Sequence, residues 1–114
     1  MGNRRQVHNM EYQFTLENFQ KDALDSKVPV LVDFYANWCG PCRAMMPVVE
    51  DIANKYEGKL RVGKVNSDEQ PELAQAFNVM SIPAFFILKN GKVVDQMVGA
   101  MPISELKGRI DAQL

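Results

Sequence analysis

Residues 28–42 read Val-Pro-Val-Leu-Val-Asp-Phe-Tyr-Ala-Asn-Trp-Cys-Gly-Pro-Cys, an apolar run that ends in two closely spaced cysteines. Branched and aromatic residues follow one another almost without interruption, which is typical of a strand covered on both faces. We therefore expect this strand near the centre of a sheet. Cys39 and Cys42 are the only cysteines in the chain. A helix that opens at this pair would bring their Cα atoms to about 5 Å, within disulfide range.

The residues after the cysteines predict a helix, a strand and a second helix. Apolar residues recur every three to four positions up to Gly58, which predicts an amphipathic helix containing Met45, Met46, Val49, Ile52, Ala53 and Tyr56. Pro47 lies inside it and predicts a kink. We expect a strand at residues 60–66 and a short helix from Pro71 that turns Leu73, Ala74 and Phe77 inward. Strands joined in this way run parallel through a right-handed crossover.

The second half of the chain predicts a hairpin and a final helix. Apolar runs at residues 84–88 and 92–98 flank Asn90-Gly91, a dipeptide typical of tight antiparallel turns. A helix follows from Ile103, with Pro102 near its start and an apolar stripe of Leu106, Ile110 and Leu114. At the other end, we expect an edge strand with Tyr12 and Phe14, then a short helix with Leu16, Phe19, Ala23 and Leu24. The fold class is α/β: a mixed five-stranded sheet flanked by four helices in three α/β/α layers.

Composition limits the classes of function. The 114 residues are 46% hydrophobic and 24% charged, which predicts one globular domain at 11–114 after a polar extension at 1–10. A net charge of −1 gives no basic field for nucleic acid. No apolar run approaches the roughly 20 residues that span a membrane, and residues 1–10 lack the apolar middle of a secretion signal. We expect a cytoplasmic monomer, or a periplasmic one if a signal has been removed.

The cysteine pair predicts redox chemistry better than it predicts a metal site. Zinc takes about four ligands, whereas this chain adds only His8 to its two thiols, so we expect no metal. Two buried structural thiols are also disfavoured, because the carboxyl end of a core strand is where α/β folds place reactive groups. Cys39 should meet the free amides and positive dipole of a helix start, which stabilise a thiolate, and so act as nucleophile. Cys42 should be more covered and act as the resolving thiol.

Asp33 is the one charged residue in the central strand. Burial would raise the pKa of its carboxyl and make it a candidate proton acceptor for Cys42, directly or through water. The alternative is an aspartate near the strand end that faces solvent.

Residues 32–42 resemble the active-site segment of thioredoxins, with a complete Trp-Cys-Gly-Pro-Cys. The resemblance runs from about Tyr12 onward and includes Pro47, Lys64, Ile82-Pro83, Asn90-Gly91-Lys92 and Val98-Gly99-Ala100. It implies the thioredoxin fold and a protein-disulfide reductase that works by dithiol–disulfide exchange through Cys39 and Cys42. It also implies disulfide-containing proteins as substrates and an NADPH-dependent thioredoxin reductase as electron donor. No cofactor bound to this chain is expected.

The resemblance also implies roles for other residues. Asp33 is the family's proton acceptor, and Lys64 would tune it by charge, although a solvated strand lysine is the alternative. Pro83 would be the family's cis-proline, which leaves the backbone of Ile82 free to pair with an extended substrate segment; an ordinary trans proline is the alternative. A flat apolar surface around the sulfurs would bind substrate through Trp38, Gly40, Pro41, Ile82, Pro83, Gly99 and Ala100, unless Trp38 packs in the core.

Some residues depart from the usual pattern of the family. Tyr35 replaces the usual tryptophan, Ala84 the threonine after the proline, and Arg43 a frequent lysine, and none of these removes a group that exchange requires. Four methionines should fill the core or its rim: Met45, Met46, Met80 and Met97. Two other functions remain open: a related oxidoreductase of an oxidising compartment, and a thioredoxin-fold subunit that binds a partner with idle thiols.

Overall fold

The computed structural model describes residues 11–114; the predicted extension at 1–10, with His8, lies outside the described residues. Five strands form one mixed sheet in the order β1-β3-β2-β4-β5. Their bounds are β1 Glu11–Gln13, β2 Val30–Tyr35, β3 Arg61–Asn66, β4 Ala84–Lys89 and β5 Lys92–Val98. The central position of β2 confirms the expectation from its apolar run.

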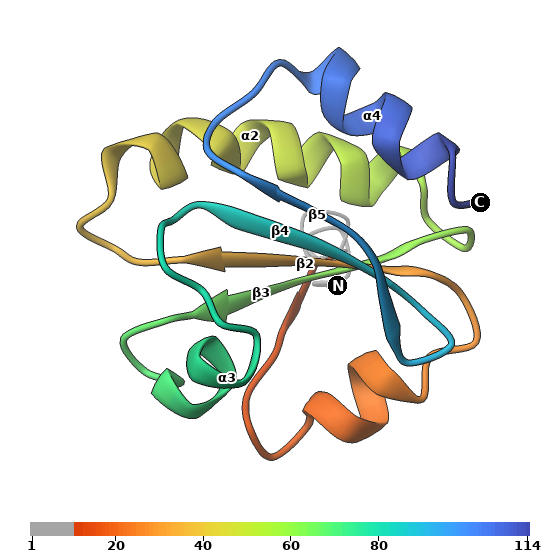
Figure 1. Ribbon diagram of the computed structural model, residues 1–114. Coiled ribbons are helices and arrows are strands. Elements are labelled where there is room, and N and C mark those ends of the chain that lie inside the picture. Colours follow the sequence, from red (N-terminus) through yellow and green to blue (C-terminus); the bar gives the residue numbers. More distant parts are fainter. Residues whose placement is uncertain (1–10) are drawn as a thin grey trace, which may run out of the picture.

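Four helices cover the sheet: η1 Gln20–Leu24, α2 Gly40–Lys55, α3 Pro71–Ala76 and α4 Ile103–Asp111. Strands β1, β3 and β2 run parallel, whereas β4 and β5 are antiparallel to their neighbours. Helices α2 and α4 lie on one face of the sheet, and η1 and α3 lie on the other (Figure 1). This arrangement confirms the predicted three-layer α/β/α architecture.

The alternation of side chains along β2 divides the core into two halves. Leu31 packs with residues of α2 and α4, whereas Val32 and Phe34 pack with residues of η1 and α3. Successive strand residues point to opposite faces, so Asp33 shares the α2 face with Leu31. The aspartate is only 3% exposed. The fold therefore buries a carboxyl within its central strand.

The turn predicted at Asn90-Gly91 and the helix predicted around Pro47 are both present in the structure. Asn90 and Gly91 have φ of 55° and 78°, the left-handed pair that a tight hairpin turn requires, and β4 and β5 are antiparallel. Helix α2 continues through Pro47 to Lys55, so the proline removes one backbone hydrogen bond without ending the helix. Within residues 11–114, no helix is both long and apolar enough to cross a bilayer.

Four apolar residues that the sequence assigns to a helix, or to the core or its rim, are exposed: Leu16 at 51%, Met46 at 47%, Met80 at 86% and Leu114 at 50%. Met46 follows Met45 in α2, and because successive helical residues are about 100° apart, only one of them can face the sheet. Met45 is 2% exposed and takes that place. Leu16 precedes η1 and Leu114 follows α4, so neither lies on the buried stripe of a helix.

Candidate active site

The cysteines lie where β2 ends and α2 begins, and they form a disulfide with a Cα–Cα distance of 5.2 Å. Cys39 is the N-cap of α2, with extended backbone angles, and its Sγ accepts a hydrogen bond from the Cys42 amide at 3.1 Å. A helix leaves its first amide groups without intrahelical partners, and here a sulfur takes one of them. The predicted contact between Cys39 and the helix start is present.

Both cysteines are buried in the oxidised state. Cys39 is 4% exposed and Cys42 is 3% exposed, so the greater cover expected for Cys42 stays a prediction. Both cysteines pack with Ala36, Tyr35 and Ile82. The asymmetry between the sulfurs therefore comes from the amide hydrogen bond to Cys39, since exposure does not provide it.

The Ile82–Pro83 peptide is cis, the isomer that the family resemblance implies, and it lies beside the disulfide. The carbonyl oxygen of Ile82 is 3.9 Å from Cys39 Sγ. Pro83 is buried, and its carbonyl accepts a hydrogen bond of 2.8 Å from the amide of Gly99. Gly99 has a φ of 97°, which favours glycine. This hydrogen bond joins the loop after β5 to the loop before β4.

Trp38 lies on the surface and not in the core, because it is 70% exposed. Its indole Nε1 donates a hydrogen bond of 2.9 Å to Asp68, which follows β3. The backbone amide of Asp68 in turn donates a hydrogen bond of 2.9 Å to the side-chain Oδ1 of Asn66. Gly40, Pro41 and Ala100 are also exposed, and Ile82 and Gly99 are partly exposed. The residues predicted to bind substrate are thus exposed or partly exposed, apart from Pro83, which is buried.

Asp33 is buried on the α2 face, and burial raises the pKa of its carboxyl from the ordinary 3.8 to about 7. The positive charge of Lys64 lowers this pKa and the negative charge of Glu11 raises it, but desolvation is the largest cause. Its Oδ1 has no hydrogen-bond partner among the described residues. The alternative of an aspartate facing solvent is therefore excluded.

Lys64 is the Cα partner of Asp33 across β2 and β3. Its ammonium lies 3.8 Å from Glu11 Oε1 and 5.2 Å from the centre of the Tyr35 ring. The lysine side chain is only 20% exposed, which excludes the reading of a solvated strand lysine. A cavity of about 310 Å³ opens beside it, lined by Lys64, Cys42, Tyr35, Ala36, Asn37, Arg43 and Met46.

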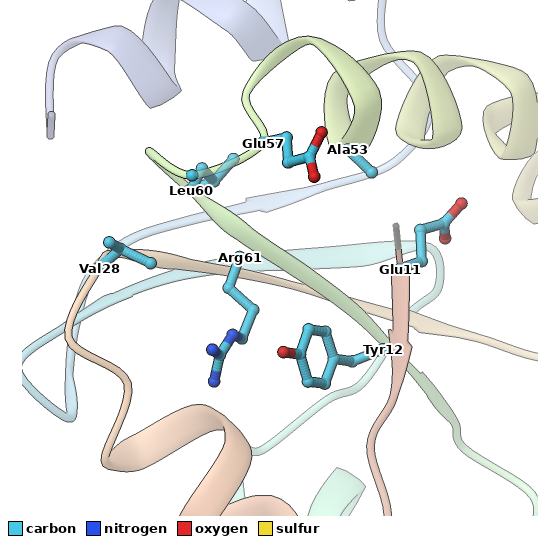
Figure 2. Close-up of a pocket in the computed structure, with 8 residues that line it drawn as sticks. Glu11, Tyr12, Val28, Ala53, Glu57, Leu60 and Arg61 are labelled. Atoms are coloured by element: carbon cyan, nitrogen blue, oxygen red, sulfur yellow. The ribbon is translucent and has the colours of Figure 1, made fainter. Parts of the chain in front are cut away.

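A second cavity, of about 500 Å³, lies at the other end of the sheet (Figure 2). Its lining includes Ala53 and Glu57 from the end of α2 and Tyr12 and Arg61 from the strands. A helix rises about 1.5 Å per residue, so this cavity lies about 20 Å along α2 from the disulfide. Glu11 also lines this cavity, and its Oε1 lies 3.8 Å from Lys64 Nζ.

Sequence reasoning missed four residues near the site. Glu11 and Asp68 carry no local signal, because each gains its partner from a distant segment of the chain. Met80 and Val98 are 86% and 65% exposed and line a cavity of about 310 Å³ that Ala84 also lines, next to Pro83. Exposed apolar residues at these two positions extend the predicted apolar surface. Within residues 11–114, no three or more His, Cys, Asp and Glu side chains form a metal-binding group.

Comparison with known proteins identifies the family. The family model described as Thioredoxin matches residues 11–112. The chain is 50% identical over 102 residues to "Thioredoxin 1" of Nostoc sp. strain PCC 7120, covering 90% of this chain and 95% of that protein. It is 48% identical over 103 residues to "Thioredoxin" of Chlorobaculum thiosulfatiphilum, with coverage of 90% and 95%. It is 42% identical over 99 residues to "Thioredoxin" of Pyropia yezoensis, with coverage of 87% and 92%. A cysteine pair at a helix start beside a cis-proline, together with these matches along almost the whole domain, shows that the chain belongs to the thioredoxin family.

Proposed function

We propose that this chain reduces disulfides in other proteins and that Cys39 is the attacking sulfur. The observation that carries the assignment is the hydrogen bond of 3.1 Å from the Cys42 amide to Cys39 Sγ at the N-cap of α2. Such a donor, with the positive end of the helix dipole, stabilises a thiolate at Cys39 in the reduced protein. The thiolate is the form of cysteine that attacks a disulfide.

The exchange has two steps. The Cys39 thiolate attacks one sulfur of the client disulfide, a mixed disulfide forms, and the other client sulfur leaves as a thiolate. Cys42 then loses its proton and attacks Cys39 Sγ, which releases the second client sulfur and closes the Cys39–Cys42 disulfide. Two electrons pass from the dithiol to the client. The Cα–Cα distance of 5.2 Å allows this closure.

Asp33 is proposed as the acceptor of the Cys42 proton. A group that takes a proton near neutrality works best with a pKa near 7, and the pKa of Asp33 is raised to about 7. The positive charge of Lys64 lowers the pKa of Asp33 and so limits the rise that burial causes. Cys42 and Lys64 line the same cavity of about 310 Å³. A water molecule in that cavity would connect the thiol to the buried carboxyl.

The client is proposed to lie along the surface around Trp38, Ile82 and Gly99. The carbonyl of Ile82 lies 3.9 Å from Cys39 Sγ, so an extended client segment paired with the Ile82 backbone would bring its sulfur to Cys39. Gly40 and Pro41 add little bulk above the disulfide, and Ala100 continues the surface beyond Gly99. This flat, small surface fits a polypeptide better than a metabolite.

The oxidised chain needs an electron donor, because each turnover consumes its dithiol. Family membership points to a reductase as partner, and we propose an NADPH-dependent thioredoxin reductase, with this chain acting as a monomer in the cytoplasm. The domain that performs the exchange is proposed to be residues 11–114, without the N-terminal ten residues.

Insulin reduction tests the proposal. Wild type, Cys39→Ser and Cys42→Ser are compared with NADPH and thioredoxin reductase, by turbidity and by NADPH consumption. We expect no turnover by either variant, and a stable mixed disulfide with insulin only for Cys42→Ser. Turnover by Cys39→Ser at the wild-type rate would contradict the assignment. A partner that binds both serine variants and never needs turnover would favour the binding-subunit alternative.

A further inference from the structure

Three charged side chains from three neighbouring strands meet on the α2 face of the sheet. Glu11 lies on β1, Lys64 on β3 and Asp33 on β2. Asp33 pairs with Lys64, and Glu11 pairs with Val62, two residues before Lys64. Residues two apart in a strand point to the same face. The cluster thus contains two partly or fully buried carboxyls and a single ammonium between them.

Lys64 forms its ion pair with the outer carboxyl, Glu11, although Glu11 Oε1 makes no hydrogen bond within residues 11–114. Lys64 Nζ lies 3.8 Å from Glu11 Oε1, with side-chain exposures of 20% and 15%. Among residues 11–114, no ion pair within 4.0 Å joins Lys64 to Asp33. Asp33 Oδ1 has no hydrogen-bond partner among these residues either. The inner carboxyl is left without a direct partner.

Within residues 11–114, the strand cation that lines a cavity together with Glu11 is Arg61, and its contacts lie elsewhere. Arg61 lies 4.5 Å from the centre of the Tyr12 ring, and its Nη1 donates a hydrogen bond of 2.9 Å to the Asp22 carbonyl. Figure 2 shows the Glu11 carboxylate directed away from Arg61, while the Tyr12 ring lies beside the arginine. Glu11 therefore depends on Lys64 for compensation.

We propose that Glu11 is a positioning residue for the reductase reaction, because it holds the Lys64 ammonium away from Asp33 and so keeps Asp33 able to accept the Cys42 proton. The inference rests on the proposed role of Asp33 as proton acceptor. The electrostatics agree with the geometry, because the charge of Glu11 raises the pKa of Asp33 whereas the charge of Lys64 lowers it. Without Glu11, the ammonium would be free to pair with Asp33.

Arg43 of α2 lines the same cavity as Lys64, and its Nη1 donates a hydrogen bond of 2.9 Å to the Asn37 carbonyl. From α2, the negative charge of Glu50 raises the pKa of Glu11. From β1, Gln13 Nε2 donates a hydrogen bond of 3.2 Å to the Tyr35 hydroxyl. On β4, the Cα partner of Asp33 is Phe85, which has no charge. Removing Glu11 therefore leaves Lys64 as the main charge acting on Asp33.

The test is the titration of the Asp33 carboxyl, followed by carbon NMR in the oxidised protein. Glu11→Gln should lower the pKa of Asp33 by about 1 pH unit or more, since a nearby cation lowers the pKa of an aspartate by roughly 1–3 units. In a Lys64→Gln background the same change should produce a smaller shift. Asp51→Asn is the matched control: it removes a carboxylate from the exposed Asp51–Lys55 ion pair and should leave Asp33 unmoved.

A second readout connects the titration to the reaction. Release of a client from the mixed disulfide with Cys39 is measured against pH for wild type, Glu11→Gln and Asp33→Asn. We expect the inflection for Glu11→Gln to move toward lower pH by the same amount as the Asp33 titration. Glu11→Met also lacks the charge and should shift the inflection in the same way. Agreement between the two variants shows that the shift does not come from a folding defect specific to Glu11→Gln.

The outcomes separate the two proposals. An Asp33 titration that is unchanged in both Glu11 variants overturns the inference and leaves the role of Asp33 intact. Equal release rates for Asp33→Asn and wild type at every pH overturn the proton-acceptor role, and with it the use of Glu11 in catalysis. A lower stability of the Glu11 variants without a shift of the Asp33 titration would show a structural ion pair only, and would also overturn the inference.

Discussion

Asp33→Asn should make the protein more stable at neutral and alkaline pH. The pKa of Asp33 is about 7 in the folded chain against an ordinary 3.8. Between these two values the folded state keeps a proton that the unfolded state has released. Stability therefore falls as the pH rises from about 4 to about 7. Asparagine stays neutral throughout and does not suffer this loss.

The size of the effect follows from the pKa difference. The rise from 3.8 to about 7 is roughly three pH units. Each unit is worth about 1.4 kcal/mol, so the ionised carboxyl costs about 4 kcal/mol in the folded state. The asparagine variant should thus gain up to about 4 kcal/mol over wild type near pH 8 and almost nothing near pH 4. If the side-chain amide of the asparagine variant lacks a hydrogen-bond partner, the loss in stability is the same at both pH values. It therefore does not alter the change between about pH 4 and about pH 8.

Guanidinium unfolding of the oxidised proteins measures this difference, because the disulfide keeps the unfolded states comparable. The quantity compared is the free energy of unfolding of the variant minus that of wild type, near pH 4 and near pH 8. Asp51→Asn serves as control, since an exposed ion pair contributes at most about 1 kcal/mol. A difference between Asp33→Asn and wild type that is the same at both pH values would refute the reasoning from burial.

Three further changes test the site and the fold. Cys42→Ser should leave the first attack intact but trap the client, so mass spectrometry should detect a mixed disulfide, and rapid release without one would argue against a resolving thiol. Asp68→Ala should free the Trp38 indole, which donates to Asp68 at 2.9 Å, and raise the KM for a protein client several-fold with little change in kcat; an unchanged KM would mean that the hydrogen bond does not position the indole. Gly63→Ala should cost about 1–3 kcal/mol in thermal or denaturant unfolding, because a Cβ on Gly63 would overlap the Phe14 ring; wild-type stability would show that the ring moves aside freely.

The fold could be predicted from sequence because its signals are local. Each of three signals is formed by residues close together in the sequence: the apolar run in β2, the Asn90-Gly91 turn and the stripe of α2. Spacing alone places both Met45 and Met46 on the stripe of α2, but helical geometry lets only Met45 face the sheet. Residues at helix ends, such as Leu114, were predicted to be buried from spacing alone and are exposed.

The site could be predicted where its chemistry lies in one motif or, as for the cis peptide before Pro83, where the resemblance to a family supplies it. Cys39 and Cys42 are three residues apart and meet in the structure as expected. Glu11 acts on Lys64 from 53 positions away in the sequence, and Asp68 acts on Trp38 from 30 positions away. No local pattern marks such pairs, because they exist only once the sheet has formed. The depth at which both cysteines are buried likewise depends on distant contacts, since Tyr35 and Ile82 pack against them.

The most direct test of the account is the rate at which each thiol of the reduced protein reacts with iodoacetamide as the pH is raised. Cys39→Ser and Cys42→Ser isolate the two thiols for this measurement. The N-cap position of Cys39 predicts that it reacts at a lower pH than an ordinary cysteine and well before Cys42. Identical profiles for the two thiols, or earlier reaction of Cys42, would contradict the claim that the start of α2 selects the attacking sulfur.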